Sequence, residues 1–132
     1  MTAVDRATRC LLAFDVVTER TFDTVQPVVD KTRGARQYYS DGLDTYQTLL
    51  YATGTHAVAP GKSQTYSVEG DNADLRHYLA RLHRRNRCFS RCPKALKRAV
   101  WLFAYAYNTR QLKKRAQPQY NFSLIECLPA IS

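Results

Sequence analysis

The sequence predicts an α/β protein in which helices cover a mixed β-sheet. Three observations lead to this class: short apolar runs typical of strands, longer segments with apolar residues at helical spacing, and the interleaving of the two along the chain. We expect strands at residues 1–5, 10–17, 35–40 and 55–59. We expect helices after Thr21, at 43–51, at 67–87 and at 94–115. This order of elements fits a mixed sheet flanked by helices.

The first half of the chain supplies the predicted strands. Residues 10–17 are apolar and partly β-branched, as a buried strand requires, and 6–9 form a turn before them. Thr18 or Thr21 caps the first helix, which Pro27 limits or bends. The strand at 35–40 is closed by Asp41 and Gly42.

Two long helices dominate the second half. Leu75, Leu79 and Leu82 recur at i, i+4 and i+7 in the first of them. In the second helix, one apolar stripe recurs at i, i+4, i+7 and i+11, and four further residues thicken it. The stripe is Leu96, Val100, Phe103 and Tyr107, and the thickening residues are Trp101, Leu102, Tyr105 and Ala106. We expect Phe122, Leu124 and Ile125 to dock the tail.

The charge is unevenly distributed. Residues 1–75 hold seven Lys/Arg and ten Asp/Glu, a net of −3, whereas 76–132 hold thirteen Lys/Arg and one acid, a net of +12. So basic a segment attracts polyanions, and nucleic acid is the natural partner. An anionic membrane surface and a generic basic surface are the alternatives.

The sequence favours a cytoplasmic protein. No run reaches the roughly 18 apolar residues of a membrane span, and no secretory signal opens the chain. Four cysteines fit small apolar side chains better than a disulfide framework. Cys88 and Cys92, with His77, His83, Cys10 or Cys127, are a zinc alternative that falls short of the usual spacing.

Two carboxylates are candidates for chemistry. Glu69, Asn72 and Arg76 share one helical face at i, i+3 and i+7, so a carboxylate lies two turns from a guanidinium. Such a pair can hold a divalent metal and a phosphate together. The alternative is an acidic first turn that complements the helix dipole, with Arg76 solvated. Asp41 ends a strand and either faces a cleft or belongs to an Asp-Gly turn.

The stretch from Tyr66 to Leu82, followed by Arg87-Cys-Phe-Ser-Arg-Cys92, resembles the C-terminal part of transposases from the first family of bacterial insertion sequences. The stretch from Tyr38 to Tyr46 resembles another block of the same family, and the resemblance runs from about Val4 to Pro129. It implies that residues 1–132 are one RNase H-like catalytic domain with a basic helical part at 67–115.

The resemblance also implies a metal site of the Asp-Asp-Glu class. Asp41 would be the second acid and Glu69 the third, both binding Mg²⁺ or Mn²⁺, with Arg76 as the basic residue that holds a phosphate. Further cations would grip the DNA backbone. These cations are Arg81, Arg84, Arg85, Arg87, Arg91, Lys94, Lys97 and Arg98.

The first acid of that site is missing from the pattern. Asp5 and Asp15 are not followed by the elements that should separate the first acid from Asp41. We therefore expect a core that lacks its first, central strand, as in a 3′-frame product of a split transposase or a decayed remnant. We expect such a chain to be inactive alone, and to need an N-terminal module or a second copy.

Two other functions compete with the transposase hypothesis. A non-catalytic DNA-binding protein would use the basic helices, with the carboxylates serving as caps and turns, and would act as a partner or inhibitor of a transposase. A structural interaction module would use the aromatic residues at 100–107.

Overall fold

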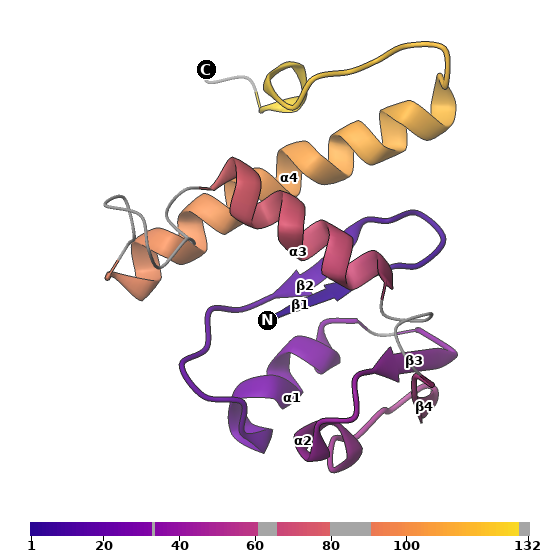
Figure 1. Ribbon diagram of the computed structural model, residues 1–132, viewed down its shortest axis with the longest axis vertical. Helices are drawn as coiled ribbons and strands as arrows, with labels where there is room; N and C mark the ends of the chain where they lie inside the picture. The colour runs from indigo at the N-terminus through magenta and orange to yellow at the C-terminus, as the bar shows by residue number, and fades with distance from the viewer. Residues whose placement is uncertain (33, 61–65, 80–90, 130–132) are drawn as a thin grey trace. The chain divides into compact units, whose positions relative to one another are not determined.

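A computed structural model of the chain describes residues 1–32, 34–60, 66–79 and 91–129. It is a mixed α/β structure with small sheets, which confirms the predicted class (Figure 1). The strands are β1 (Thr2–Val4), β2 (Leu11–Phe14), β3 (Gln37–Ser40) and β4 (Thr55–Val58). The helices are α1 (Phe22–Asp30), α2 (Asp44–Gln47), α3 (Tyr66–Tyr78) and α4 (Pro93–Ala116), followed by the 3-10 helix η2 (Ile125–Cys127). Among the helices described, none has the length and apolar character that crossing a membrane requires.

The chain divides into two compact units. Unit 1 consists of Met1–Val4 and Leu12–Gly70, and unit 2 of Asp5–Leu11 and Asp71–Ser132. Unit 1 contains β1, most of β2, α1, the β3–β4 pair and the first turn of α3. Unit 2 contains the hairpin turn, the rest of α3, α4 and the tail.

The described strands form two sheets of two strands each. β1 pairs with β2, and β3 pairs with β4. Among the strands of the described ranges, none bridges the two pairs, so each pair keeps its own hydrogen-bonded ladder. The sequence predicted a mixed sheet that lacks its central strand, and the described part of the chain contains two small sheets.

β1 and β2 form an antiparallel hairpin. At its open end the Met1 amino group donates to the Asp15 carbonyl at 2.8 Å, and the Asp15 N–H donates back to the Met1 carbonyl at 3.0 Å. At the turn the Asp5 N–H donates to the Cys10 carbonyl at 2.8 Å. The Asp5 carboxylate accepts from the Thr8 N–H at 2.8 Å and hydroxyl at 2.5 Å. The Thr8 hydroxyl is the main reason why the pKa of Asp5 lies below its usual value.

Thr21 is the N-cap of α1, and the helix packs its apolar side toward β1. The Thr21 N–H donates to the Thr24 hydroxyl at 3.0 Å, which satisfies a group that the helix leaves unpaired. Val25 and Val28 are fully buried. Pro27 lies inside the helix but does not end it, because α1 continues to Asp30. Of the two caps that the sequence offered, Thr18 and Thr21, the structure has Thr21.

β3 and β4 pair in parallel, from Gln37 opposite Thr55 to Ser40 opposite Val58. A parallel pair needs a crossover of a dozen or more residues, and the segment with α2 between the strands provides it. We expected Asp41 to follow a buried strand, but the side chains of β3 alternate between exposed and half-buried. β3 has one pairing partner in the described structure and cannot be covered like a central strand.

The entry to β4 depends on a glycine. A Cβ atom at Gly54 would collide with the Ala35 carbonyl oxygen and lie 2.7 Å from that of Arg36. Both atoms belong to the backbone that leads into β3, so they cannot move aside as a flexible side chain would. Only glycine allows the two chain segments to approach this closely.

Unit 2 is organised by α4. Its buried stripe comprises Leu96, Val100, Phe103, Ala104, Ala106 and Tyr107. Leu75 of α3 is also buried, and the Tyr78 and Phe103 rings are 5.9 Å apart. Leu79 is half-buried just beyond α3, and Leu82 lies outside the described residues. The expected stripe of α4 is confirmed.

Part of the predicted thickening of that stripe was wrong. Trp101, Leu102 and Tyr105 are 58%, 42% and 45% exposed. These three positions lie on the side of the helix away from Val100 and Phe103, and a single helix buries only the stripe that faces its neighbours. Ala106 is buried, as expected.

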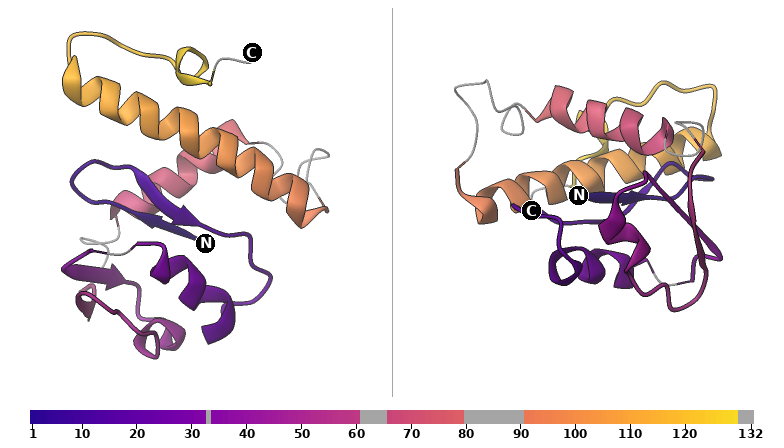
Figure 2. Two further views of the ribbon diagram at one scale, coloured as in Figure 1. Left: turned by 180° about the vertical axis from the view of Figure 1, so that it is seen from behind. Right: turned by 60° about the horizontal axis from the view of Figure 1, so that its bottom comes forward.

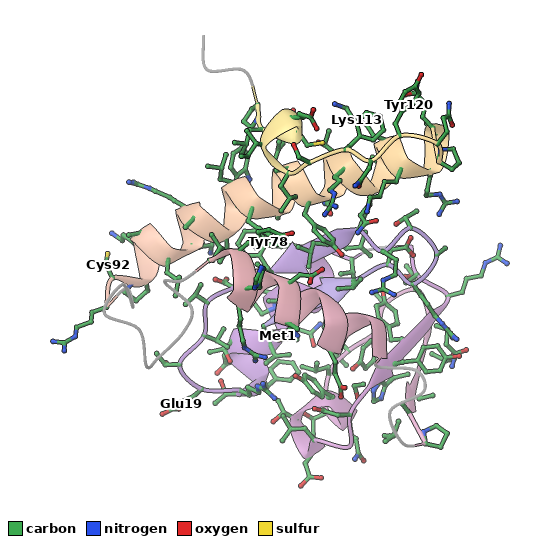
Figure 3. The ribbon with its side chains drawn as sticks, turned by 45° about the horizontal axis from the view of Figure 1, so that its top comes forward. Met1, Glu19, Tyr78, Cys92, Lys113 and Tyr120 are labelled. Carbon is green, nitrogen blue, oxygen red and sulfur yellow. The ribbon has the colours of Figure 1, made fainter. Side chains whose placement is uncertain are left out.

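After α4 the tail turns back and runs beside the helix (Figures 1 and 2). The Arg110 Nε–H donates to the Phe122 carbonyl at 2.6 Å, and the Lys113 ammonium lies 5.5 Å from the Phe122 ring centroid. Figure 3 shows Lys113 near Tyr120 at this end of α4. Cys127 is almost fully buried, whereas Ile125, which we expected to dock the tail, is 79% exposed.

The Asn108 side chain covers part of the edge of β2. Its Oδ1 accepts from the Leu11 N–H at 2.7 Å, and its Nδ2 donates to the Leu11 carbonyl at 2.8 Å. The amide thus replaces a neighbouring strand at this residue, which protects an otherwise unpaired edge.

We predict that Gly54→Ala lowers the free energy of unfolding by about 1–3 kcal/mol, because the new methyl group forces backbone apart. Gly42→Ala is the matched control, since its Cβ would make an ordinary 3.8 Å contact with Val58. That control should be neutral or slightly stabilising. Urea denaturation of both variants measures the difference, and equal stabilities would contradict the prediction.

We predict that Asn108→Asp destabilises the protein by about 1–3 kcal/mol, because the Leu11 carbonyl loses its donor and faces a carboxylate instead. Asn121→Asp adds the same charge at an exposed position and serves as the control. Thermal or urea unfolding of the two variants provides the measurement. If the Asn108→Asp protein is as stable as Asn121→Asp, the hydrogen bonds between the Asn108 amide and Leu11 contribute nothing to stability.

Candidate functional site

Asp41 lies at the carboxyl end of β3, directly after Ser40, and its side chain is exposed. The Ser40 hydroxyl donates to the Asp41 carbonyl at 2.8 Å. Strand β4 ends beside it, since the Ala59 N–H donates to the Ser40 carbonyl at 3.0 Å. The carboxylate is therefore held at the end of a paired strand and is accessible to a ligand.

Two side chains of unit 1 share the electrostatic surroundings of Asp41. Burial raises the pKa of the Tyr46 phenol, the Arg20 guanidinium opposes that rise, and the Asp41 carboxylate adds to it. The Thr45 hydroxyl donates to the Arg20 carbonyl at 2.9 Å, which ties α2 to the segment before α1. The Tyr46 phenol thus lies within electrostatic reach of both Asp41 and Arg20.

Glu69 lies in the first turns of α3 and is exposed. Arg76 follows two turns later on the same helix and is exposed too, as the i, i+7 spacing predicts. Asn72 between them is half-buried. The local half of the prediction, a carboxylate and a guanidinium along one helix, matches the structure of α3.

The structure places the two predicted metal ligands in one compact unit. Asp41 and Glu69 belong to unit 1, whereas Arg76 belongs to unit 2. Across the described ranges, no group of three or more His, Cys, Asp or Glu side chains is arranged to hold a metal ion. The joint action of Asp41, Glu69 and Arg76 stays a prediction.

Asp5 and Asp15, the other acids considered as ligands, have local roles. The Asp5 carboxylate accepts from Thr8 within the hairpin turn. The Asp15 carboxylate accepts from the Val16 N–H at 2.8 Å. These local hydrogen bonds give both carboxylates a structural role that does not involve a metal ion.

The predicted DNA-binding cations fall into two groups. Arg91, Lys94, Lys97 and Arg98 are exposed around the first turns of α4, the end of the helix that follows Cys92, which Figure 3 labels. Arg81, Arg84, Arg85 and Arg87 lie outside the described residues. The first group therefore provides the described part of a basic surface.

Sequence reasoning missed a cluster next to Asp41 that consists of Ser40, His56, Tyr51 and Tyr38. The Ser40 Oγ and His56 Nε2 atoms are 2.7 Å apart. The Tyr51 ring stacks on His56 with centroids 4.7 Å apart, and Tyr38 lies 4.8 Å from Tyr51. Burial and the neighbouring Tyr46 and Tyr38 phenols raise the pKa of Tyr51 to about 12.

The cluster fixes the backbone at Asp41. Ser40 has one hydroxyl proton, and when it goes to the Asp41 carbonyl, His56 must donate its Nε2–H to Ser40. Period-2 alternation already places Tyr38 and Ser40 on one face of the strand. The parallel register, which sets His56 opposite Tyr38, was the missing information.

We predict that His56 makes stability depend on pH. Burial lowers the pKa of His56 from its ordinary value of 6.5, so the unfolded chain binds a proton more readily than the folded one. The stability that neutral His56 contributes is complete at pH values above its pKa in the unfolded chain. This stability is lost as pH falls from there through its pKa in the folded protein. Unfolding free energies of wild type and His56→Phe from about pH 8 to about pH 5 measure it.

The wild type should lose stability relative to His56→Phe as pH falls through this window, because phenylalanine keeps a flat ring but cannot titrate. An NMR titration of the His56 ring in the folded protein measures the pKa directly. A folded-state pKa at or above the ordinary histidine value would contradict the prediction.

The chain matches no protein-family model, no curated protein and no solved structure. The site is therefore argued from its own residues, and the transposase resemblance of the stretches at 38–46 and 66–82 stays a prediction.

Proposed function

We propose that the chain is a catalytic-domain polypeptide of an Asp-Asp-Glu transposase that supplies two of the three acids of an RNase H-like site. Its substrate is DNA at the ends of an insertion sequence and at the target. Asp41 and Glu69 act as metal ligands and Arg76 as a phosphate contact. The expected location is the nucleoid, in the cytoplasm.

One observation carries the proposal: the described residues form a β1–β2 hairpin and a separate parallel β3–β4 pair, with α1 between them along the chain. In the expected core, a central first strand lies beside the strand that ends at Asp41. Without that strand, a hairpin and a parallel pair are what remain. Two separate two-stranded sheets are unusual as finished architecture, because an isolated pair is marginally stable.

The donor set at the two carboxylates is compatible with Mg²⁺ or Mn²⁺. Asp41 and Glu69 are exposed, belong to the same unit and carry the hard oxygen ligands that Mg²⁺ prefers. Ions of this kind would activate a water molecule or a 3′-hydroxyl and would stabilise the leaving oxygen. The two side chains provide part of such a shell and leave positions for phosphate oxygens.

The basic side chains have a separate task. Lys94 and Arg98 in the first turns of α4 contact the DNA backbone, which positions the duplex without reading its sequence. Arg76 holds a phosphate near α3. The third acid comes from an N-terminal transposase module or a second copy, so the isolated chain does not cleave or join DNA.

The second candidate function is a non-catalytic DNA-binding partner or inhibitor of a transposase. α4 favours it, because the helix carries seven Lys and Arg residues and no acid. Here Asp41 closes a strand and Glu69 complements the N-terminus of α3, with neither binding metal.

We predict that Mg²⁺ or Mn²⁺ binds the chain and that Asp41→Asn or Glu69→Gln weakens this binding at least tenfold, because each removes a charged ligand. Asp44→Asn is the matched control, since Asp44 is an exposed acid three residues from Asp41. Isothermal titration calorimetry with Mn²⁺ measures the three variants.

Equal Mn²⁺ affinity in all variants would contradict the metal site and favour the second function. In that case DNA binding should be metal-independent and fall steeply with salt. A strand-transfer assay on end-containing DNA tests activity. Robust joining by the isolated chain, abolished by Asp41→Ala, would contradict the proposed incompleteness.

A further inference from the structure

The exposed side of α4 combines cations and aromatic rings in one line. Lys94, Arg98, Trp101 and Tyr105 follow each other at i, i+4, i+7 and i+11, which places them along one face of the helix. All four are exposed, and the face lies opposite the buried stripe around Phe103.

The two rings of this face form a continuous aromatic surface. Trp101 and Tyr105 lie one turn apart, with centroids 6.1 Å apart and ring planes inclined by 29°. Trp101 is 58% exposed and Tyr105 is 45% exposed. Because both rings are exposed, they do not belong to the core of unit 2. Stacked rings that face solvent can instead bind a flat ligand.

Charge narrows the choice of ligand. α4 contains no Asp or Glu, and Lys94 and Arg98 precede the rings on the same line. A protein partner for a purely apolar face would not need this row of cations. Single-stranded nucleic acid offers both complements, since its phosphates attract cations and its unpaired bases stack on aromatic rings. In a duplex the base faces are hidden.

We propose that this face of α4, the Lys94–Tyr105 face, binds single-stranded nucleic acid. Lys94 and Arg98 bind backbone phosphates, and bases stack on Trp101 and Tyr105. The line is about 16 Å long, which gives room for a few nucleotides. The inference rests on the proposed function in taking DNA as the ligand, but it requires neither Asp41, Glu69 nor a metal.

The test uses the full chain with a chelator present and a labelled oligothymidylate as the probe. Trp101 is the sole tryptophan, so quenching of indole emission reports contact at this face. We expect quenching on binding, and we expect Trp101→Ala to weaken binding roughly 5- to 100-fold in fluorescence anisotropy. An abasic oligonucleotide of the same length should bind more weakly and leave the emission unchanged.

Matched variants separate stacking from charge. Tyr120→Ala removes an aromatic ring of similar exposure from the tail and should leave binding unchanged. Trp101→Phe should keep most of the affinity. Arg98→Gln should weaken binding and reduce its salt dependence. If Trp101→Ala does not fold, wild-type quenching together with Trp101→Phe and Arg98→Gln decides the question.

Three outcomes would overturn the proposal in distinguishable ways. Tight binding without quenching, unchanged in Trp101→Ala, would place the DNA elsewhere and leave the proposed function intact. No binding of single-stranded or duplex DNA would overturn this inference and the DNA-binding part of the proposed function together. Self-association that sedimentation detects in the wild type and not in Trp101→Ala, with a shift of wild-type Trp101 emission over the same concentrations, would identify the face as a protein interface.

Discussion

The parallel pairing of β3 with β4 is the constraint on which the candidate site depends. The backbone segments that lead into β3 and β4 must pass close to each other. Gly54 permits this because it has no Cβ atom to collide with the carbonyls of Ala35 and Arg36. The resulting register sets His56 opposite Tyr38, within reach of the Ser40 hydroxyl. Ser40 in turn donates to the Asp41 carbonyl. The backbone position of Asp41 therefore depends on the contact of Ser40 with His56, which lies sixteen residues further along the chain.

Helices were predictable because their signals are local. The 94–115 segment became α4 within one residue at each end, and its stripe at Leu96, Val100 and Phe103 is buried. The error at Trp101 has a physical origin: apolar character indicates that a side chain favours burial, but only a neighbouring element can bury it. The sequence shows which face of a helix is apolar, not how wide the contact with that neighbour is.

Strand pairing was harder to predict because it depends on partners far apart along the chain. The short strands were found near their observed positions, yet no local pattern states that β1 pairs only with β2 and β3 only with β4 among the described residues. The same limitation hid the Ser40–His56 contact. For the candidate acids, spacing gave Glu69 and Arg76 along one helix, but the separation of Asp41 from Glu69 is a tertiary property that periodicity does not encode.

The proposed metal ligands and the proposed DNA-binding cations belong to different units. Asp41 and Glu69 belong to unit 1, whereas Lys94 and Arg98 belong to unit 2. Carboxylates repel a phosphate backbone unless a cation neutralises them, so the proposed contact of DNA with these acids requires a bound metal ion. Binding through α4 is therefore expected without metal, and any contact of DNA with Asp41 only with it. Metal dependence thus distinguishes the two surfaces, whichever function the chain performs.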